Sequence, residues 1–238
     1  MPMRHAIDPA MLGGVALFQG LPPENLKAVI ERADWRRLHK GDAVFRQSDP
    51  ADTMFVLVTG HVKVHQATAD GQQVVIRFIN PWEMMGCVAV CGGGSYPGTA
   101  EAVEDCGVLA WPRGTLDQLM DRFPRIARNA LSTVSHRLQD TQQQLREVAT
   151  ERVERRIAHA LMRLAELSGR RGADGGTEIA FPITRKDIAD MTGTTLHTVS
   201  RTLSGWEAQG LVANARQRIT VLQPDALGAI ADDWPTAS

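Results

Sequence analysis

The stretch from 183 to 206 constrains the fold more than any other, because it predicts two short helices joined by a tight turn. Thr184 stands three residues before Asp187, and this spacing is typical of a capping box at a helix N-terminus. Gly193 is expected to end the first helix, since glycine tolerates the left-handed backbone that such a turn needs. The stretch therefore predicts a helix-turn-helix.

The second helix of this motif is predicted to have two different faces. Either Thr194 or Thr195 caps it, while Val199 and Leu203 lie four residues apart and are expected to face inward. The other face carries hydroxyls, an imidazole and a guanidinium, which contact base edges and phosphates in a major groove. The pattern favours DNA binding. The alternative is a surface helical hairpin with a purely structural role.

Charge supports DNA binding only locally. The chain of 238 residues has a formal net charge of −1, which gives no general attraction to nucleic acid. Between 152 and 222, however, eleven Lys or Arg residues stand against seven Asp or Glu residues. A β-hairpin predicted at 210–222, with its turn at 214–216, adds two of these cations to the motif. The candidate DNA-binding residues are Arg185, Lys186, Thr195, His197, Thr198, Ser200, Arg201, Arg216 and Arg218.

The N-terminal half has the alternating period of strands. Short apolar segments separated by Gly and Asp turn signals predict an antiparallel barrel or sandwich, and with the helices they make an α+β protein. In segment 61–66 the valines are expected to face inward, and Lys63 and His65 outward. Residues 81–90 are expected to form a single helical turn. The predicted strands are 35–40, 43–47, 53–58, 61–66, 73–79, 99–103 and 106–111.

A second informative pattern is an apolar seam that alternates steps of four and three residues. It consists of Ala127, Leu131, Val134, Leu138, Thr141, Leu145 and Val148. Three heptads of this kind favour a parallel two-stranded coiled coil, so the seam is the candidate dimer interface. The alternative is a single helix that packs the stripe on its own domain. Thr141, the one polar member, is expected to fix the register or meet a ligand.

These patterns divide the chain into a sensor domain at 1–122, a dimerisation helix at 123–150 and a DNA-binding domain at 151–238. Residues 168–177 are expected to be a flexible loop, and a short strand is expected to start at Ile179. The sequence has neither a long apolar run nor a secretory signal, so we expect a cytoplasmic protein without a membrane partner. Three cysteines and no export signal predict no structural disulfides.

The ordered set of β-roll, long helix and winged helix-turn-helix resembles the Crp/Fnr family of bacterial regulators. The markers are Lys40-Gly41-Asp42, Gly60-His-Val-Lys-Val, Asp70-Gly71, Pro81-Trp-Glu83 and the motif at 183–203. The resemblance implies a cyclic-nucleotide-binding-like β-roll (jelly roll), a coiled-coil dimerisation helix and a C-terminal winged helix-turn-helix. It also implies a homodimer that binds a palindromic operator in double-stranded DNA and recruits RNA polymerase, and we expect activation of transcription.

In this family the second helix of the motif reads the major groove. By position, His197, Ser200 and Arg201 match the base-contacting residues, and the Ser-Arg pair is similar to the Fnr branch. We therefore expect half-sites that begin with TTG. His197 departs from the family pattern, which usually has a glutamate there, so the inner bases of the operator are left open.

The effector is less constrained. The family's cyclic AMP pocket uses Gly-Glu and Arg-Ser, whereas this chain has Trp82-Glu83 and Tyr96-Pro97. A buried phosphate would lack a counter-charge, so cyclic AMP is not expected. An iron–sulfur cluster of the Fnr type needs four cysteines, and the chain has three.

A third effector hypothesis comes from the resemblance to the nitrogen-oxide-responsive (Dnr/NnrR-like) branch, in which haem is the proposed nitric oxide receptor. Candidate axial ligands are His5, His39, His61 and His65, although each is equally a candidate for a solvated surface histidine. The candidate effector-pocket residues are Trp82, Glu83, Met84, Met85, Cys87, Tyr96, Leu138, Thr141 and Gln142. The alternatives are a regulator that responds through redox thiols and one without an effector.

Two other classes of function, an enzyme and a protein-interaction module, are alternatives to a DNA-binding regulator. An enzyme using Glu83 as acid or base would need a second carboxylate, a paired nucleophile or a phosphate loop, and none accompanies Glu83. A protein-interaction module with a degenerate motif is the remaining rival. We expect a regulator and no catalytic residues.

Overall fold

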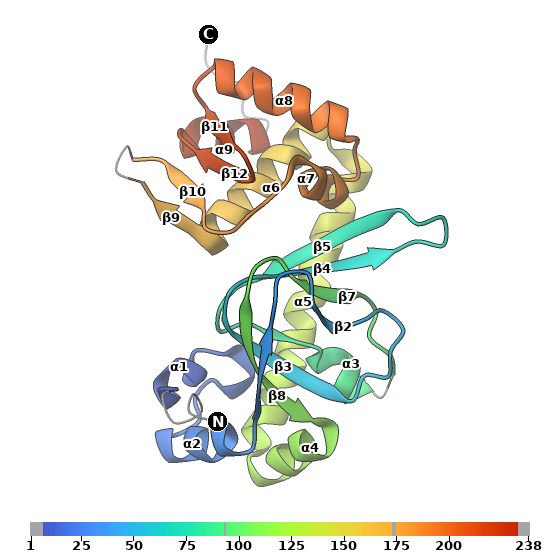
Figure 1. The fold of residues 1–238 in the computed structure, drawn as a ribbon, viewed down its shortest axis with the longest axis vertical. Helices are drawn as coiled ribbons and strands as arrows, with labels where there is room; N and C mark the ends of the chain where they lie inside the picture. Colours follow the sequence, from blue (N-terminus) through green and yellow to red (C-terminus); the bar gives the residue numbers. More distant parts are fainter. Residues whose placement is uncertain (1–6, 93, 173–174, 233–238) are drawn as a thin grey trace. The chain divides into compact units, whose positions relative to one another are not determined.

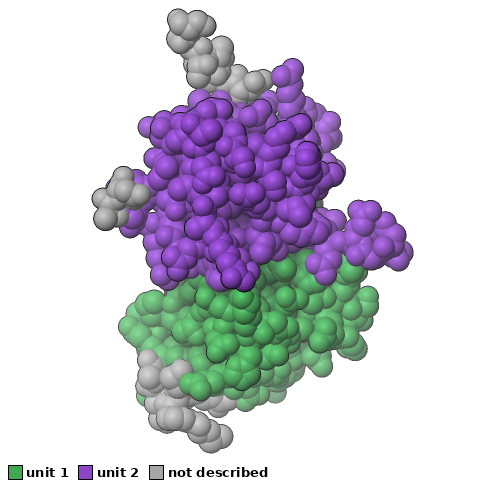
Figure 2. Space-filling view, turned by 45° about the horizontal axis from the view of Figure 1, so that its top comes forward, with its two compact units in different colours: residues 1–67, 77–141 green, residues 68–76, 142–238 purple. Residues whose placement is uncertain are grey.

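The computed structural model describes residues 7–92, 94–172 and 175–232 (Figure 1). His5, one candidate haem ligand, lies outside the described residues. The chain divides into two compact units, coloured separately in Figure 2. The first contains residues 1–67 and 77–141, and the second contains residues 68–76 and 142–238.

Two four-stranded antiparallel sheets form the β-roll (Figure 1). One has the order β1-β8-β3-β6, with β1 at Asp34–Leu38, β8 at Cys106–Pro112, β3 at Thr53–Thr59 and β6 at Met84–Met85. The other has the order β2-β7-β4-β5, with β2 at Ala43–Phe45, β7 at Thr99–Ala102, β4 at Val62–Ala67 and β5 at Gln73–Ile79. Apart from the hairpin of β4 and β5, neighbouring strands in the two sheets are not consecutive in the chain, as expected of a jelly-roll arrangement.

Helices cover one end of the roll. They are α1 at Pro9–Gly13, the 3-10 turn η2 at Ala16–Phe18, α2 at Pro23–Glu31 and α4 at Arg113–Arg122. Trp111 on β8 is fully buried, and its indole Nε1 donates to the Val29 carbonyl of α2 at 2.9 Å. Its ring lies 5.5 Å from that of Phe18. Because an indole must keep its hydrogen bond when buried, this contact fixes α2 against the sheet.

The alternation predicted for segment 61–66 is confirmed for Val62, which is fully buried, but it is wrong for His65. His65 is buried, whereas Val64 is only half-buried. A carboxylate compensates the buried ring, since His65 Nε2 lies 3.7 Å from Glu101 Oε2 on β7. His61 is buried as well, with its Nδ1 2.5 Å from Glu104 Oε1. Neither is the solvated histidine expected on an outward strand face.

The helical turn predicted for 81–90 is wrong over its first half. Trp82 has a positive φ of 68°, which stops a helix from starting at Pro81. Met84–Met85 pairs with β3 as strand β6, and helix α3 begins only at Cys87 and ends at Gly92. The turn thus brings two methionines into the core of the roll.

Helix α5 runs from Pro124 to Thr150, so the long helix expected at 123–150 is present. Its 27 residues correspond to about 40 Å of helix. The division between the two compact units falls within it, after Thr141. The predicted domain boundaries at 122 and 150 stay predictions.

The second unit contains four further helices and a four-stranded antiparallel sheet of order β11-β12-β10-β9 (Figure 1). The helices are α6 at Val153–Ser168, α7 at Arg185–Thr192, α8 at Leu196–Ala208 and α9 at Pro224–Asp232. The strands are β11 at Val212–Ala215, β12 at Arg218–Val221, β10 at Thr177–Ile179 and β9 at Gly169–Arg171.

Two local predictions in this unit need correction. The segment expected to be a loop contributes strand β9 and the start of β10, which pair through Thr177 and Arg171. The wing turn lies at Arg216-Gln217 rather than at 214–216, because Asn214 and Ala215 still pair with β12. Gln217, the second residue of this turn, has a positive φ of 59°.

Among the helices of the described ranges, none is long and apolar enough to cross a membrane.

Candidate nucleic-acid interface

Helix α7 starts at the predicted capping box, which is confirmed. Thr184 Oγ1 accepts from the Asp187 amide at 3.1 Å, and Asp187 Oδ2 accepts from the Thr184 amide at 2.9 Å. The Thr184 hydroxyl also donates to the same carboxylate at 2.6 Å. These bonds satisfy amides that the first turn of a helix leaves unpaired.

A left-handed glycine joins α7 to α8. Gly193 has φ 60° and ψ 43°, and the amide of Thr194 donates to the Ala189 carbonyl at 3.1 Å. Thr195 is the residue that caps α8, since its hydroxyl accepts from the Thr198 amide at 3.1 Å. The choice left open between the two threonines is thereby settled in favour of Thr195.

The inner face of α8 is buried in the second unit. Val199 and Leu203 have no exposed surface, which confirms that they face inward. Trp206 is also buried, and its indole Nε1 donates to Glu154 Oε1 of α6 at 3.2 Å. With this face held, the opposite face of α8 is displayed to solvent.

The displayed face carries the predicted base-contacting residues. His197 and Arg201 are exposed, and Thr198 and Ser200 are half-buried between them and the core. Thr198 is also bonded through its hydroxyl to that of Thr195 at 2.9 Å. An imidazole and a guanidinium are therefore exposed on this face of α8.

A groove of about 590 Å³ separates the start of α7, the start of α8 and the wing. Three of its cations come from the predicted set and belong to two separate elements. Its lining is Ile183, Thr184, Arg185, Lys186, Leu196, Asn214, Ala215, Arg216, Gln217 and Ile219. Lys186 forms an ion pair with Asp190 one turn along α7, so part of its charge is neutralised locally.

The wing is held in place by main-chain contacts. The amide of Ile183 donates to the Gln217 carbonyl at the wing turn, at 3.1 Å. Asn214 donates from its amide to Glu207 Oε1 on α8 at 3.0 Å. Arg216 and Arg218 are exposed, the latter 3.7 Å from Glu178. Sequence reasoning missed Asn214 and Gln217, because their position depends on a turn that it placed two residues too early.

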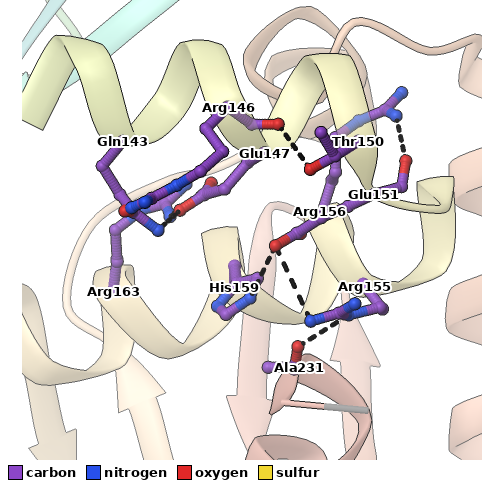
Figure 3. A network of polar contacts seen from close by, with 10 residues as sticks. All are labelled: Gln143, Arg146, Glu147, Thr150, Glu151, Arg155, Arg156, His159, Arg163 and Ala231. Carbon is purple, nitrogen blue, oxygen red and sulfur yellow. Dashed lines mark hydrogen bonds and ion pairs between the residues drawn. The ribbon is translucent and has the colours of Figure 1, made fainter.

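Helix α6 connects the end of α5 to this motif through a polar network (Figure 3). Glu147 near the end of α5 is buried, and both of its carboxylate oxygens accept from Arg163 Nη1, at 3.0 and 2.9 Å. One turn on, Glu151 lies 3.5 Å from His159 and 3.8 Å from Arg155.

Arg156 extends the same network. It donates from Nη1 to the Glu151 carbonyl at 2.8 Å and from Nε to the Thr192 carbonyl of α7 at 2.9 Å. The ends of α5 and α7 are thus joined through one guanidinium. None of these network residues was predicted, because the contacts depend on how the helices pack.

The candidate effector segment forms a second polar cluster, in the first unit. Glu83 accepts from Asn80 Nδ2 at 3.0 Å and lies 3.6 Å from Arg77. The Met84 carbonyl accepts from Arg77 at 3.1 Å and from Arg137 of α5 at 3.2 Å. Burial and the neighbouring Arg137 guanidinium lower the pKa of Arg77 to about 10.

Other members of the candidate pocket are placed differently. Tyr96 is buried, stacks on Phe45 at 4.0 Å, and its hydroxyl donates to the Thr53 carbonyl at 2.6 Å. Leu138 and Thr141 are exposed on α5, and Gln142 belongs to the second compact unit. The grouping of these residues into one effector pocket stays a prediction.

The candidate haem ligands among the described residues contact acidic side chains. His61 and His65 face Glu104 and Glu101, as described above, and exposed His39 lies 3.6 Å from Asp105. Within the part of the chain that the structure describes, there is no group of three His, Cys, Asp or Glu residues that could hold a metal ion.

Comparison with known proteins agrees with this arrangement. Residues 35–123 match the family model of a cyclic nucleotide-binding domain, and residues 155–230 match that of a Crp-like helix-turn-helix domain. The chain is 27% identical over 218 residues to the cyclic AMP receptor protein of Thermus thermophilus, covering 92% of this chain and 97% of that protein.

A further relative and a solved structure extend the likeness over most of the chain. The transcriptional activator protein anr of Pseudomonas aeruginosa is 27% identical over 234 residues, which is 97% of this chain and 94% of that protein. The structure of FixK2 from Bradyrhizobium japonicum has the same fold, with a TM-score of 0.75 at 24% identity over 83% of this chain and 96% of that chain. The prediction of a regulator rather than an enzyme is confirmed: the chain belongs to the Crp/Fnr family of DNA-binding transcription regulators.

Proposed function

We propose that this regulator is a homodimer that reads a palindromic operator with helix α8 of each copy. The observation that carries the proposal is the pair of exposed side chains, His197 and Arg201, on a helix whose opposite face is fully buried. A helix anchored in this way enters a major groove without losing its own packing. The cations of the adjacent groove, Arg185 and Arg216 among them, supply phosphate contacts.

The homodimer is supported by the seam of α5. All seven seam residues are exposed in the single chain, with exposed fractions of 69% at Leu131, 58% at Leu138 and 68% at Leu145. A contiguous apolar stripe of this length marks an interaction surface. Its heptad spacing fits a second copy of itself, and a two-fold dimer requires two half-sites one helical turn apart, about 34 Å.

The expected half-site begins with TTG, with Arg201 donating to a guanine and to a neighbouring phosphate. His197 takes the position at which the family usually has glutamate, so we propose that it determines the inner bases. A neutral imidazole can accept from a base through one ring nitrogen, whereas a glutamate accepts as an anion.

Binding to a labelled TTG-N8-CAA duplex, with an unrelated duplex as competitor, tests the proposal. We expect Arg201→Ala to lose about 1–3 kcal/mol of discrimination, which is roughly a 5- to 150-fold loss of preference. Arg37→Ala is the matched control, because Arg37 is exposed on β1 and its loss removes the same charge. A dimer that binds both duplexes equally at moderate salt would contradict the proposal.

We further propose that operator binding recruits RNA polymerase and activates transcription. Support comes from the relative in Pseudomonas aeruginosa, which is itself named a transcriptional activator. Transcription in vitro from a promoter carrying the operator upstream should rise when the protein is added. A fall in transcript, with Arg201→Ala restoring it, would show a repressor instead.

A response to nitric oxide through haem is carried by the resemblance alone. The packing argues against a haem site at the Trp82 turn, because the side chains of Met84 and Met85 are already buried in the protein core. Among the candidate ligands, His61 and His65 each face a glutamate. An absorption spectrum of protein prepared with haem decides the question: a Soret band would support the hypothesis, and a flat spectrum excludes it.

A further inference from the structure

Two cysteines lie within reach of each other on the short helix α3. The Sγ atoms of Cys87 and Cys91 are 3.9 Å apart, one helical turn from each other. Cys87 is buried and Cys91 is exposed. The pair thus combines a thiol open to small solutes with a second thiol held directly behind it.

The surroundings shift the pKa values of the two thiols in opposite directions. The hydrogen bond from Cys87 lowers the pKa of Cys91 to about 7, with help from Arg113 and against burial and the charge of Asp117. The same hydrogen bond and burial raise the pKa of Cys87, although the Arg137 guanidinium opposes this shift. The direction of these shifts and the exposure of Cys91 both favour Cys91 as the thiol that ionises first.

The third cysteine, Cys106, has different surroundings. It is buried on β8, and its thiol donates to the carbonyls of His61 and Glu104 at 3.3 and 3.2 Å. Burial raises its pKa to about 11. A protonated and buried thiol is inert, so Cys106 provides an internal control.

The backbone around α3 allows the two sulfur atoms to approach. A disulfide needs an S–S distance of about 2.05 Å and Cα atoms about 4.4–6.8 Å apart, and one helical turn satisfies the Cα distance. It also needs Cβ atoms about 3.5–4.5 Å apart, whereas residues four apart in a helix have Cβ atoms about 5–6 Å apart, so the last turn of α3 has to unwind when the bond forms. Gly92 and Gly94 follow Cys91, and neither has another group within 4 Å of its would-be Cβ position. The space beside these two glycines is open, and the Gly94 carbonyl accepts from the Ala51 amide at 3.0 Å.

We propose that Cys87 and Cys91 form a peroxide-reactive dithiol site, with Cys91 as the attacking and Cys87 as the resolving residue. The Cys91 thiolate attacks one peroxide oxygen and the O–O bond breaks, which gives a sulfenic acid and hydroxide. The Cys87 sulfur then displaces the sulfenic hydroxyl, which leaves as water with the Cys87 proton. Two electrons pass from the thiols to hydrogen peroxide. The site goes beyond the proposed function and does not depend on DNA binding.

Thiol titration of the full-length chain tests this site. After reaction with equimolar hydrogen peroxide and denaturation, we expect the three thiols of the chain to fall to one and the intact mass to fall by about two hydrogen atoms. Cys106→Ser should still lose two thiols, and Cys91→Ser should lose none. Retention of all three thiols in the unmodified chain, or a disulfide between two chains, would overturn the proposal.

Two measurements keep the test decisive if a variant folds poorly. In the unmodified chain, the rate of thiol loss should rise about tenfold between pH 6 and pH 8, because the thiolate fraction of Cys91 rises through its pKa of about 7. Phenylarsine oxide, which bridges two neighbouring thiols without oxidising them, should bind one equivalent and block the reaction. A rate independent of pH, or reaction unaffected by the arsenical, would contradict the assigned roles.

Discussion

Helices α5 and α8 are both amphipathic, but their apolar faces have different surroundings. In α8, Val199, Leu203 and Trp206 are buried within the second unit. In α5, the seam is exposed along its whole length. The two helices have a similar spacing of apolar residues, and they differ in whether those residues are packed against other elements of the chain. A helix with a buried apolar face offers its polar face to a charged ligand, whereas one with an exposed seam needs an apolar partner.

The largest effect on the free energy of unfolding is expected from a substitution in the buried face of α8. Leu203→Ala removes a fully buried side chain and should lower the free energy of unfolding by about 2–5 kcal/mol. Leu196→Ala on the same helix is the control, since Leu196 is 49% exposed and should change stability by at most about 0.5 kcal/mol. Urea unfolding measures both. Equal effects would mean that the face of α8 is not anchored as described.

The corresponding change on α5 should act on assembly instead of folding. Leu138→Asp places a charge in the seam, and losing a buried leucine costs about 1.5–3 kcal/mol for each of the two chains, so the dimer should weaken roughly 150-fold or more. Leu167→Asp, at a leucine 67% exposed on α6 outside the seam, is the control. Analytical ultracentrifugation would distinguish them. A dimer that survives Leu138→Asp unchanged would assign the interface to another surface.

The end of α5 is held by polar contacts rather than by an apolar face. Glu147→Ala removes the partner of Arg163 from a buried position, and we expect the free energy of unfolding to fall by about 1–3 kcal/mol. Glu166→Ala, an exposed glutamate on α6, should have little effect. Thermal unfolding at low and high salt checks both variants. An unchanged midpoint in Glu147→Ala would show that the contact contributes nothing to stability.

Local signals explain what the sequence predicts well. The capping box of Thr184 and Asp187 and the turn at Gly193 are set by residues a few positions apart, and both are present as predicted. The long helix α5 is likewise present as predicted, because heptad steps depend only on helical geometry, while the dimer interface on its seam stays a prediction.

Non-local contacts explain the failures. His65 is buried because Glu101 comes from a strand far along the chain, and β9 exists because Arg171 pairs across a glycine-rich segment with Thr177. The contacts of the candidate effector segment are the ones that the sequence predicts least. Arg77 and Arg137 meet at the Met84 carbonyl from different elements, and no spacing in the sequence brings them together.

The smallest change in stability is expected at the N-terminal cap of α8. Thr195→Ala removes the hydroxyl that accepts from the Thr198 amide, which should lower the free energy of unfolding by about 0.5–2 kcal/mol. Thr195→Ser keeps that acceptor and should leave stability nearly unchanged. Thermal unfolding of the two variants separates the capping role from simple loss of the side chain.

Operator binding by the same two variants separates capping from DNA contact. If Thr195 acts only as the cap, Thr195→Ser binds the operator like the original chain. Thr195→Ala then loses affinity only insofar as the first turn of α8 frays. A loss of affinity in Thr195→Ser without a loss of stability would show that the methyl group itself contacts DNA. In that case the DNA-contacting face of α8 includes its capping residue Thr195. The contrast with α5, whose exposed face is apolar, would then hold from the N-terminal cap of α8 onward.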